Sequence, residues 1–249
     1  MHQAPEYDRA PRLRGRRRRL WAALLLGTAA VAYNGWLLEF LLPTGLDPRH
    51  SYVSELYAAD QPFQGLFSGI EIACALLVTG GALLARYTLP GRLAATGWWA
   101  VIAFAGCSVA DTIVPMRCAP SVERFCEAVN PWHTITSALV HFAVFSSMAL
   151  LSAAAKAGCP RLPLIRRWGP WVLSCAMVCA VATVGPLFGG PGWHGVAQRA
   201  HLILVGTWFA LLAVALVRSL THDESATGTP TVAYVPWPPQ TTSTSSAIT

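Results

Sequence analysis

The amino-acid sequence predicts an all-α, polytopic membrane protein in which six transmembrane helices form one bundle. Apolar residues make up 54% of the 249 positions and charged residues only 12%, a balance that a soluble domain of this length does not have. Six apolar stretches are also long enough to cross about 30 Å of hydrocarbon at a rise of about 1.5 Å per residue. Little of the chain remains outside them to form a soluble domain.

The predicted spans divide the chain into three regions. They cover residues 20–42, 63–85, 93–115, 132–155, 168–189 and 195–218. A transmembrane domain over residues 20–220 therefore lies between a basic arm, residues 1–19, and a C-terminal tail, residues 221–249. The tail is rich in Thr, Ser and Pro and has few residues to bury, so we expect it to be disordered. Pro170 and Pro186 are expected to bracket the fifth helix.

The distribution of Lys and Arg predicts the orientation of the chain. With the N-terminus inside, fourteen of the eighteen basic residues lie in the arm or near inner loops and four lie outside. Since inner loops are enriched in Lys and Arg, we expect both termini to be cytoplasmic and the protein to be multi-pass in the cell (plasma) membrane. Seven of these residues stand in the first nineteen positions, where they suit contact with anionic lipid headgroups. The net charge of +6 is thus a topology signal, and we expect no nucleic-acid partner.

The N-terminus also fits a second interpretation. The segment "RLRGRRRR" before "LWAALLLGTAAVAY" resembles a secretory signal peptide with a small-residue cleavage site at residues 30–32. However, the apolar run continues through "LLEFLL" to full spanning length. We therefore expect the first helix to stay attached.

Two cysteines share one predicted outer loop, "MRCAPSVERFCEAVNPW". Disulfides persist outside the cytoplasm, so Cys118 and Cys126 are expected to form a local bridge, with two unpaired thiols as the alternative. No His and no second Cys pair stands at ligand spacing beside them, so no metal site is predicted there.

Ionisable residues inside the spans are confined to the predicted outer half of the bundle. Such side chains cost several kcal/mol in hydrocarbon unless they have a partner or water. Asp111 and Arg199 are expected to pair at shallow depth, and Glu71 to meet a histidine a turn or two lower. We predict that they line a water-accessible polar cup facing outward; ordinary structural pairs are the alternative. The candidate cup residues are His50, Ser54, Glu55, Glu71, Asp111, His133, His141, His194, Gln198, Arg199 and His201.

Several motifs resemble a known family. "DPRHSYVSELYAADQP" (47–62), the 111–115 exit of the third helix, the His-bearing start of the fourth and "GVAQRAHLIL" (195–204) are similar to the bacterial membrane family catalogued as domain of unknown function 998, related to Frag1/DRAM/Sfk1-like membrane proteins. The resemblance covers about residues 20–218 and implies no reaction. It implies site roles for Ser54, Glu55, Asp111, His141, Gln198 and Arg199. The cysteine loop and Tyr57, where Gly is commoner, depart from the family pattern.

The primary functional hypothesis is a non-catalytic protein that binds a lipid headgroup or an envelope or membrane protein partner, without a cofactor. In this hypothesis Arg199 faces a phosphate, and Glu55 or Asp111 orients it. The proposed partners are therefore membrane lipids and envelope components.

Three other functions are considered. An intramembrane metal-dependent lipid hydrolase or transferase would use Ser, Asp and His, as in the transmembrane hydrolase superfamily that includes alkaline ceramidases. His133 and His141 are eight residues apart, however, so they lie about 12 Å apart along a helix and cannot share one ion directly. Haem ligation by His141 and His201, and proton-coupled transport through Glu71 and His141, are the remaining alternatives.

Overall fold

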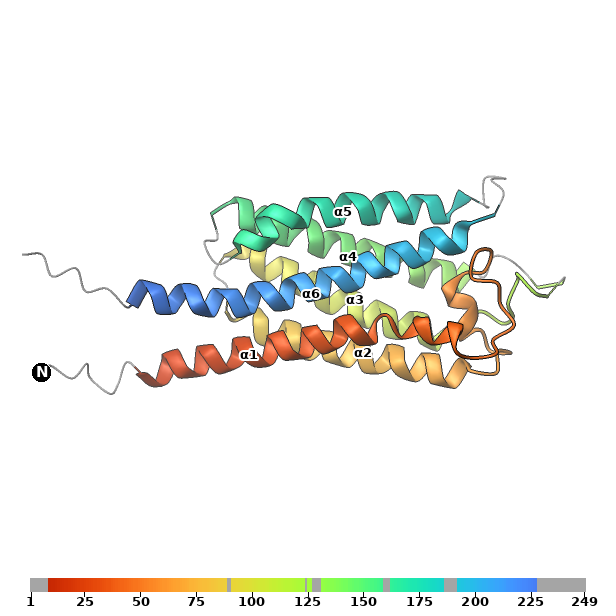
Figure 1. The fold of residues 1–249 in the computed structure, drawn as a ribbon, viewed down its shortest axis with the longest axis horizontal. Helices are drawn as coiled ribbons and strands as arrows, with labels where there is room; N and C mark the ends of the chain where they lie inside the picture. Colours follow the sequence, from red (N-terminus) through yellow and green to blue (C-terminus); the bar gives the residue numbers. More distant parts are fainter. Residues whose placement is uncertain are drawn as a thin grey trace, which may run out of the picture.

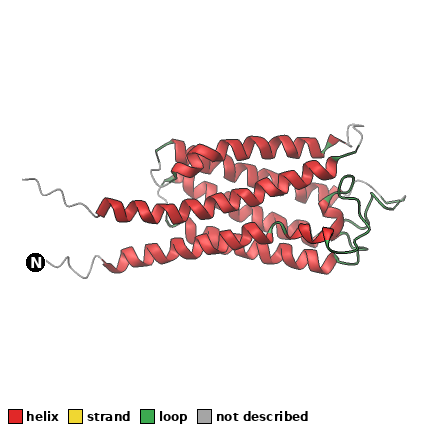
Figure 2. Cartoon of the chain, in the orientation of Figure 1, coloured by secondary structure: helices red, strands yellow, loops and turns green. Residues whose placement is uncertain are grey.

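The computed structural model describes residues 9–88, 91–123, 125–126, 131–158, 162–185 and 192–227, and every regular element in these ranges is a helix (Figure 2). The α-helices are α1 (Arg9–Ala32), α2 (Gln64–Ala85), α3 (Arg92–Ile113), α4 (Pro131–Lys156), α5 (Pro163–Thr183) and α6 (His194–Thr227). Two short 3-10 helices, η2 (Gly35–Phe40) and η3 (Val53–Tyr57), lie between α1 and α2. The all-helical fold class is confirmed.

Six described segments are long and apolar enough to span a membrane, the first of them running from Leu13 through η2 to Phe40. Each helix packs against its neighbours in sequence, and α6 packs against α1, so the six helices form a closed ring. The N-terminal end of α1 and the C-terminal end of α6 lie at the same end of the bundle (Figure 1). We call this the terminal end, and the opposite end, which carries η3 and the residue 114–126 loop, the loop end.

The first span is not the single continuous helix that its apolar length predicts. It begins earlier, at Arg9, and its α-helical part ends at Ala32. The side-chain amide of Asn34 donates a hydrogen bond to the Ala30 carbonyl oxygen at 2.9 Å, which satisfies a carbonyl that the interrupted helix leaves free. Gly206 of α6 faces this break, and a Cβ there would collide with the Asn34 amide. The break is therefore fitted to the close approach of α1 and α6.

Two other boundaries differ from those predicted. Helix α5 begins at Pro163, so Pro170 lies inside it and does not mark its start. Pro170 is the eighth residue of the helix, beyond its first turn, so it removes one interior backbone hydrogen bond, the one that its N–H would donate to the Arg166 carbonyl oxygen. Helix α6 continues to Thr227, nine residues past the predicted end. Pro186 and residues 228–249 of the predicted tail lie outside the described residues.

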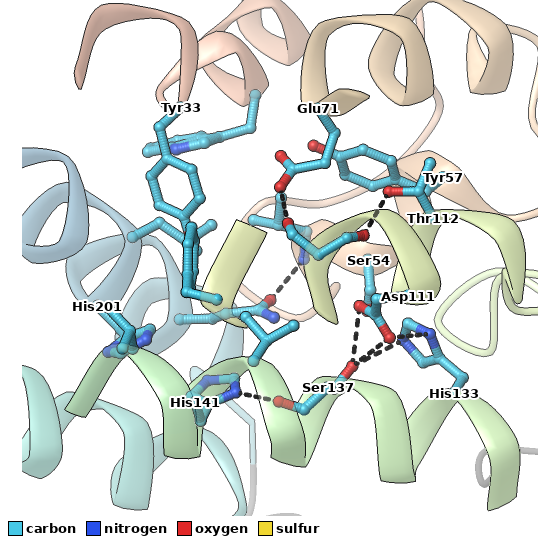
Figure 3. Close-up of a pocket in the computed structure, with 18 of the residues that line it drawn as sticks. Tyr33, Ser54, Tyr57, Glu71, Asp111, Thr112, His133, Ser137, His141 and His201 are labelled. Carbon is cyan, nitrogen blue, oxygen red and sulfur yellow. Dashed lines mark hydrogen bonds and ion pairs between the residues drawn. The ribbon is translucent and has the colours of Figure 1, made fainter. Parts of the chain in front are cut away.

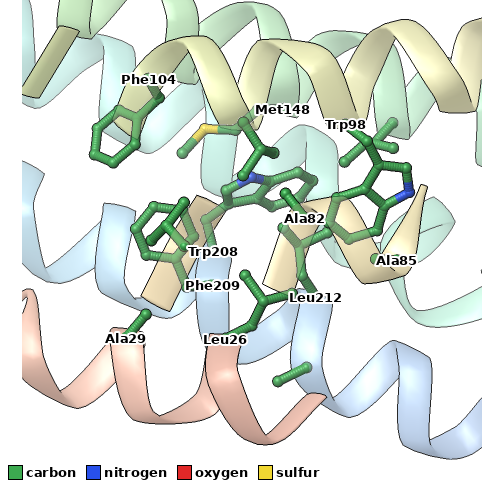
Figure 4. Packing of buried hydrophobic residues seen from close by; sticks show 14 of the residues in the cluster. Leu26, Ala29, Ala82, Ala85, Trp98, Phe104, Met148, Trp208, Phe209 and Leu212 are labelled. Carbon is green, nitrogen blue, oxygen red and sulfur yellow. The ribbon is translucent and has the colours of Figure 1, made fainter. Parts of the chain in front are cut away.

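An apolar core fills the bundle between the pocket described below and the terminal end. Large side chains from several helices interlock there, including Trp98, Trp208, Phe209 and Leu26, each at most 1% exposed (Figure 4). Small residues allow the helices to approach, as membrane bundles require. A Cβ on Gly81 of α2, for example, would lie 2.7 Å from the Leu26 side chain of α1.

The loop end has a smaller core of its own, formed by residues such as Trp36, Val53, Leu56 and Phe67. The predicted disulfide is present between Cys118 and Cys126. The backbone N–H of Ala59 donates to the Met116 carbonyl oxygen at 2.9 Å, which joins the segment after η3 to the cysteine loop. The loops thus form an ordered layer over this end of the bundle.

Candidate functional site

A polar pocket lies inside the bundle beneath the loop layer, with a cavity volume of about 100 Å³. This volume accommodates several water molecules or one small polar group. Seven of the eleven candidate cup residues line it: Ser54, Glu71, Asp111, His133, His141, Gln198 and His201. Figure 3 shows Tyr33, Glu71 and Tyr57 on one side, with His201, His141, Ser137 and His133 on the other. The pocket therefore gathers polar side chains from five helical elements.

The Asp111 carboxylate of α3 is held by the first turns of α4. The His133 Nδ1 lies 3.1 Å from its Oδ1, and the Ser137 hydroxyl donates to both carboxylate oxygens at 3.0 and 3.1 Å. The Thr136 hydroxyl donates a further hydrogen bond. This concentration of donors stabilises a carboxylate in a site that is only partly open to solvent.

Deeper in the pocket, two histidines from different helices stack on each other. The rings of His141 and His201 have centroids 4.8 Å apart and planes inclined by 17°. Nδ1 of His141 lies 2.7 Å from the Ser137 carbonyl oxygen, and Nδ1 of His201 lies 3.0 Å from that of Ala176. Glu71 does not bond to either ring; it accepts a hydrogen bond from the Ser108 hydroxyl. Its carboxylate nevertheless lines the same pocket. Glu71, His141 and His201 therefore converge as predicted, but the predicted contact between Glu71 and a histidine is not made.

Arg199 does not pair with Asp111, so that prediction is wrong. Its guanidinium forms two hydrogen bonds with Glu39 of η2, at 2.6 and 2.5 Å, and a further pair with the Ser51 and Gly195 carbonyl oxygens at 2.9 and 3.1 Å. Both charged groups are almost completely buried, at 7% and 1% side-chain exposure. Four of its five N–H donors are thus engaged, and Arg199 is absent from the pocket lining, so it does not face a ligand phosphate there in the way the sequence hypothesis required.

Glu55 is also structural. One of its carboxylate oxygens accepts from the Tyr52 backbone N–H at 2.8 Å, and the other from the backbone N–H and hydroxyl of Ser121 at 3.0 and 2.5 Å. It thereby fixes η3 to the cysteine loop. Burial raises the pKa of the Tyr52 hydroxyl, and the nearby Glu55 carboxylate raises it further.

The remaining candidate residues dock the 47–62 segment onto α6. Gln198 lines the pocket and accepts from the Val53 backbone N–H at 2.6 Å. The ring of His194 lies against that of Tyr52 with centroids 4.3 Å apart, and exposed His50 contacts the segment just before α6. The conspicuous polarity of this segment thus serves mainly to hold a cover over the pocket.

Sequence reasoning missed several pocket residues, among them Ser108, Ser137 and the aromatic side chains of Tyr33 and Trp36. The signal for Ser137 was present: it stands four residues after one histidine of α4 and four before the next, so all three share a helical face. Ser108 likewise precedes Asp111 by three positions. The aromatic residues carry no such signal, because their spacing is equally typical of core packing.

The side-chain arrangement does not fit the metal and haem alternatives. Among the described residues, no three His, Cys, Asp or Glu side chains come close enough together to hold a metal ion. His141 and His201 stack face to face, whereas axial haem ligands point a ring nitrogen at an iron atom between them. The described geometry therefore gives no support to metal-dependent hydrolysis or haem binding.

The fold and the pocket define a multi-pass helical membrane protein with a buried polar pocket near one end of the bundle. The chain belongs to the family described as "Protein of unknown function (DUF998)", whose model matches residues 26–215. No curated protein and no solved structure matches the chain. The wider relation to Frag1/DRAM/Sfk1-like proteins stays a prediction.

Proposed function

We propose that the protein binds the polar headgroup of a membrane lipid in this pocket, without catalysing a reaction. The observation that carries the proposal is the pocket itself, in which carboxylates, imidazoles and hydroxyls meet next to the large apolar core of the bundle. Exposing such groups in hydrocarbon is costly, so a cavity that concentrates them favours a polar occupant. An envelope protein partner is the alternative ligand.

The proposed orientation places the pocket in the outer half of a cell membrane. Described basic residues at the terminal end include Arg18, Arg86, Arg92, Arg166 and Arg167, next to helix ends that the positive-inside rule assigns to the cytoplasm. The disulfide at the loop end favours the same orientation, because disulfides persist outside the cytoplasm.

Hydrogen bonding in the pocket favours binding over catalysis. The Ser137 hydroxyl donates to Asp111, while the nearest His133 ring nitrogen is 3.5 Å away. Within the described residues, the hydrogen-bond partner of the Ser54 hydroxyl is the sulfur of Met116, at 3.6 Å. Neither serine is therefore activated by an imidazole base in the manner of a nucleophile.

The test is to fill the pocket without removing a polar group. Val140 lines the pocket, whereas Leu139 on the same helix is 48% exposed on the outer surface of the bundle. Val140→Phe is expected to abolish lipid retention and Leu139→Phe to leave it unchanged, as measured by native mass spectrometry of purified full-length protein. The membrane abundance of both variants controls for folding. Equal retention by both folded variants would contradict the proposal.

A further inference from the structure

The charge of the pocket indicates which headgroup it accepts. Two carboxylates, Glu71 and Asp111, line the pocket, but no Lys or Arg is among its lining residues. The nearby cation Arg199 is neutralised by Glu39 through two hydrogen bonds. An anionic ligand would therefore meet two carboxylates without a Lys or Arg side chain in the lining to offset their charge.

The two deep histidines add hydrogen-bond acceptors. A carbonyl oxygen can only accept, so the contacts from Nδ1 of His141 and His201 to backbone carbonyls assign the proton of each neutral ring to Nδ1. Each Nε2 is then an acceptor. This part of the pocket is therefore suited to a ligand that donates hydrogen bonds.

Of the two carboxylates, Glu71 is the one that can accept further hydrogen bonds. Asp111 receives hydrogen bonds from Thr136 and Ser137 and pairs with His133. Glu71 by contrast accepts one hydrogen bond, from Ser108 to its Oε1, and within the described part of the chain its Oε2 has no hydrogen-bond partner. A ligand cation is the natural counter-ion for such a group inside a membrane.

Aromatic rings complete the pocket. Tyr33, Trp36, Tyr57 and Phe104 all line it, with the Tyr33 and Phe104 rings packed edge to face at 5.8 Å. Aromatic faces attract ammonium groups, most strongly where water is excluded. Trp36 is only 4% exposed, and its indole N–H finds no acceptor among the residues that the structure describes. It is an available donor for an oxygen atom of the same ligand.

We propose that this pocket binds an alkylammonium group, with Glu71 as its counter-ion and the aromatic side chains as its walls. The proposal rests on the proposed function and specifies the ligand class of the same pocket. The amine can belong to a phospholipid headgroup, such as ethanolamine or choline, or to a free small amine. Both sources present the same cation to the pocket, so the experiment has separate arms for them.

The first arm uses full-length protein in phosphatidylglycerol nanodiscs, with calorimetric titration of ethanolamine, choline and 3,3-dimethyl-1-butanol, the neutral isostere of choline. Binding of an amine, with at least about tenfold weaker binding of the neutral isostere, is expected for a free amine ligand. Equal binding of choline and its isostere would overturn the ammonium assignment and leave pocket binding itself intact.

The second arm measures lipid retention by native mass spectrometry from vesicles that contain phosphatidylethanolamine, phosphatidylcholine and phosphatidylglycerol in equal amounts. Retention of an amine-bearing lipid supports the lipid source. Preferential retention of phosphatidylglycerol contradicts the ammonium assignment while supporting headgroup binding. If neither arm detects a ligand, both the ligand class and the proposed function fail.

Glu71→Gln tests the counter-ion in whichever arm gives binding. The substitution keeps the shape of the side chain and the hydrogen bond that it accepts from the Ser108 hydroxyl, but it removes the negative charge. The affinity for the amine is therefore expected to fall at least about tenfold. Glu123→Gln, at an exposed carboxylate of the cysteine loop, is the matched control and is expected to bind like the wild type. Thermal unfolding confirms that each variant is folded. Unchanged amine affinity in folded Glu71→Gln protein would overturn the assignment.

Discussion

The ion pair of Glu39 and Arg199 is almost completely buried, at 1% and 7% side-chain exposure. It joins η2 to α6, and two backbone carbonyl oxygens complete the hydrogen bonding of the guanidinium. Removing one partner of such a pair leaves an uncompensated buried charge, whereas removing both does not. Its contribution is therefore measurable only through a double-mutant cycle.

We predict that Glu39→Gln and Arg199→Gln each lower the free energy of unfolding by about 3 kcal/mol. The double variant is expected to lose clearly less than the sum of the two, because no unpaired charge remains. Denaturant titration in detergent micelles measures all three. Additive losses would show that the two groups are not coupled and contradict the pair.

A second residue-scale prediction concerns two carboxylates at the exposed surface of the loop end. A hydrogen bond to Asp60 raises the pKa of Glu123 above its ordinary value. The folded protein then holds a proton that the unfolded chain releases at lower pH, so this pair stabilises the fold less as the pH rises through that interval. The effect is small, since the groups are exposed and screened.

The expected result is that the unfolding temperature of the wild type declines more between pH 4 and pH 7 than that of Asp60→Asn. Thermal scans at several pH values, with both proteins in the same detergent, make the comparison. Parallel pH profiles would exclude a shared proton between these two side chains.

At the scale of the elements, helix contacts depend on where small residues stand. Gly81 of α2 faces α1, and an added Cβ would lie 2.7 Å from Leu26, whereas a Cβ on Gly106 of α3 would meet nothing within 4 Å. We predict that Gly81→Ala destabilises the protein by about 1–3 kcal/mol through overpacking. Gly106→Ala is expected to be neutral or slightly stabilising, because Ala is the better helix former. Thermal unfolding of the two variants side by side tests this difference.

The elements also show what the sequence could and could not predict. The number and order of the spans followed from apolar length alone, because a helix must satisfy its own backbone in lipid. The break at Asn34 did not follow from apolar length. It depends on the hydrogen bond from the Asn34 side chain to the Ala30 carbonyl oxygen and on Gly206, which faces it from α6. Propensity at a single position contains no information about a neighbouring helix.

The same limit applies to the pocket. Depth along each helix correctly brought Glu71, His141 and His201 into one cavity. Partner choice was wrong for Arg199, because two carboxylates were available at similar depth and only the course of η2 decides which one it meets. The sequence gives the depth of a residue along its helix. Which side chains pair also depends on the rotation of each helix about its axis and on the course of the loops.

For the whole molecule, the main prediction is topology. The N-terminal end of α1 and the C-terminal end of α6 lie at one end of the bundle (Figure 1), and from the charge distribution we expect that end to face the cytoplasm. Alkaline phosphatase fused after residue 122, at the loop end, is expected to be active in bacterial cells, because this enzyme folds only outside the cytoplasm. A fusion after residue 158, at the terminal end, is expected to be inactive. The reverse pattern would place the pocket in the inner leaflet.

The contact between α1 and α6 closes the ring of helices, and the N-terminal end of α1 and the C-terminal end of α6 lie at the same end of the bundle. The C-terminal end of α4 and the N-terminal end of α5 also lie there (Figure 1), so we expect a circular permutant that links α6 to α1 and opens the chain between α4 and α5 to keep the fold. Every helix would keep both of its neighbours, and the new termini would emerge on the original side of the membrane. The order in which the helices are synthesised can thus be changed separately from the way they pack.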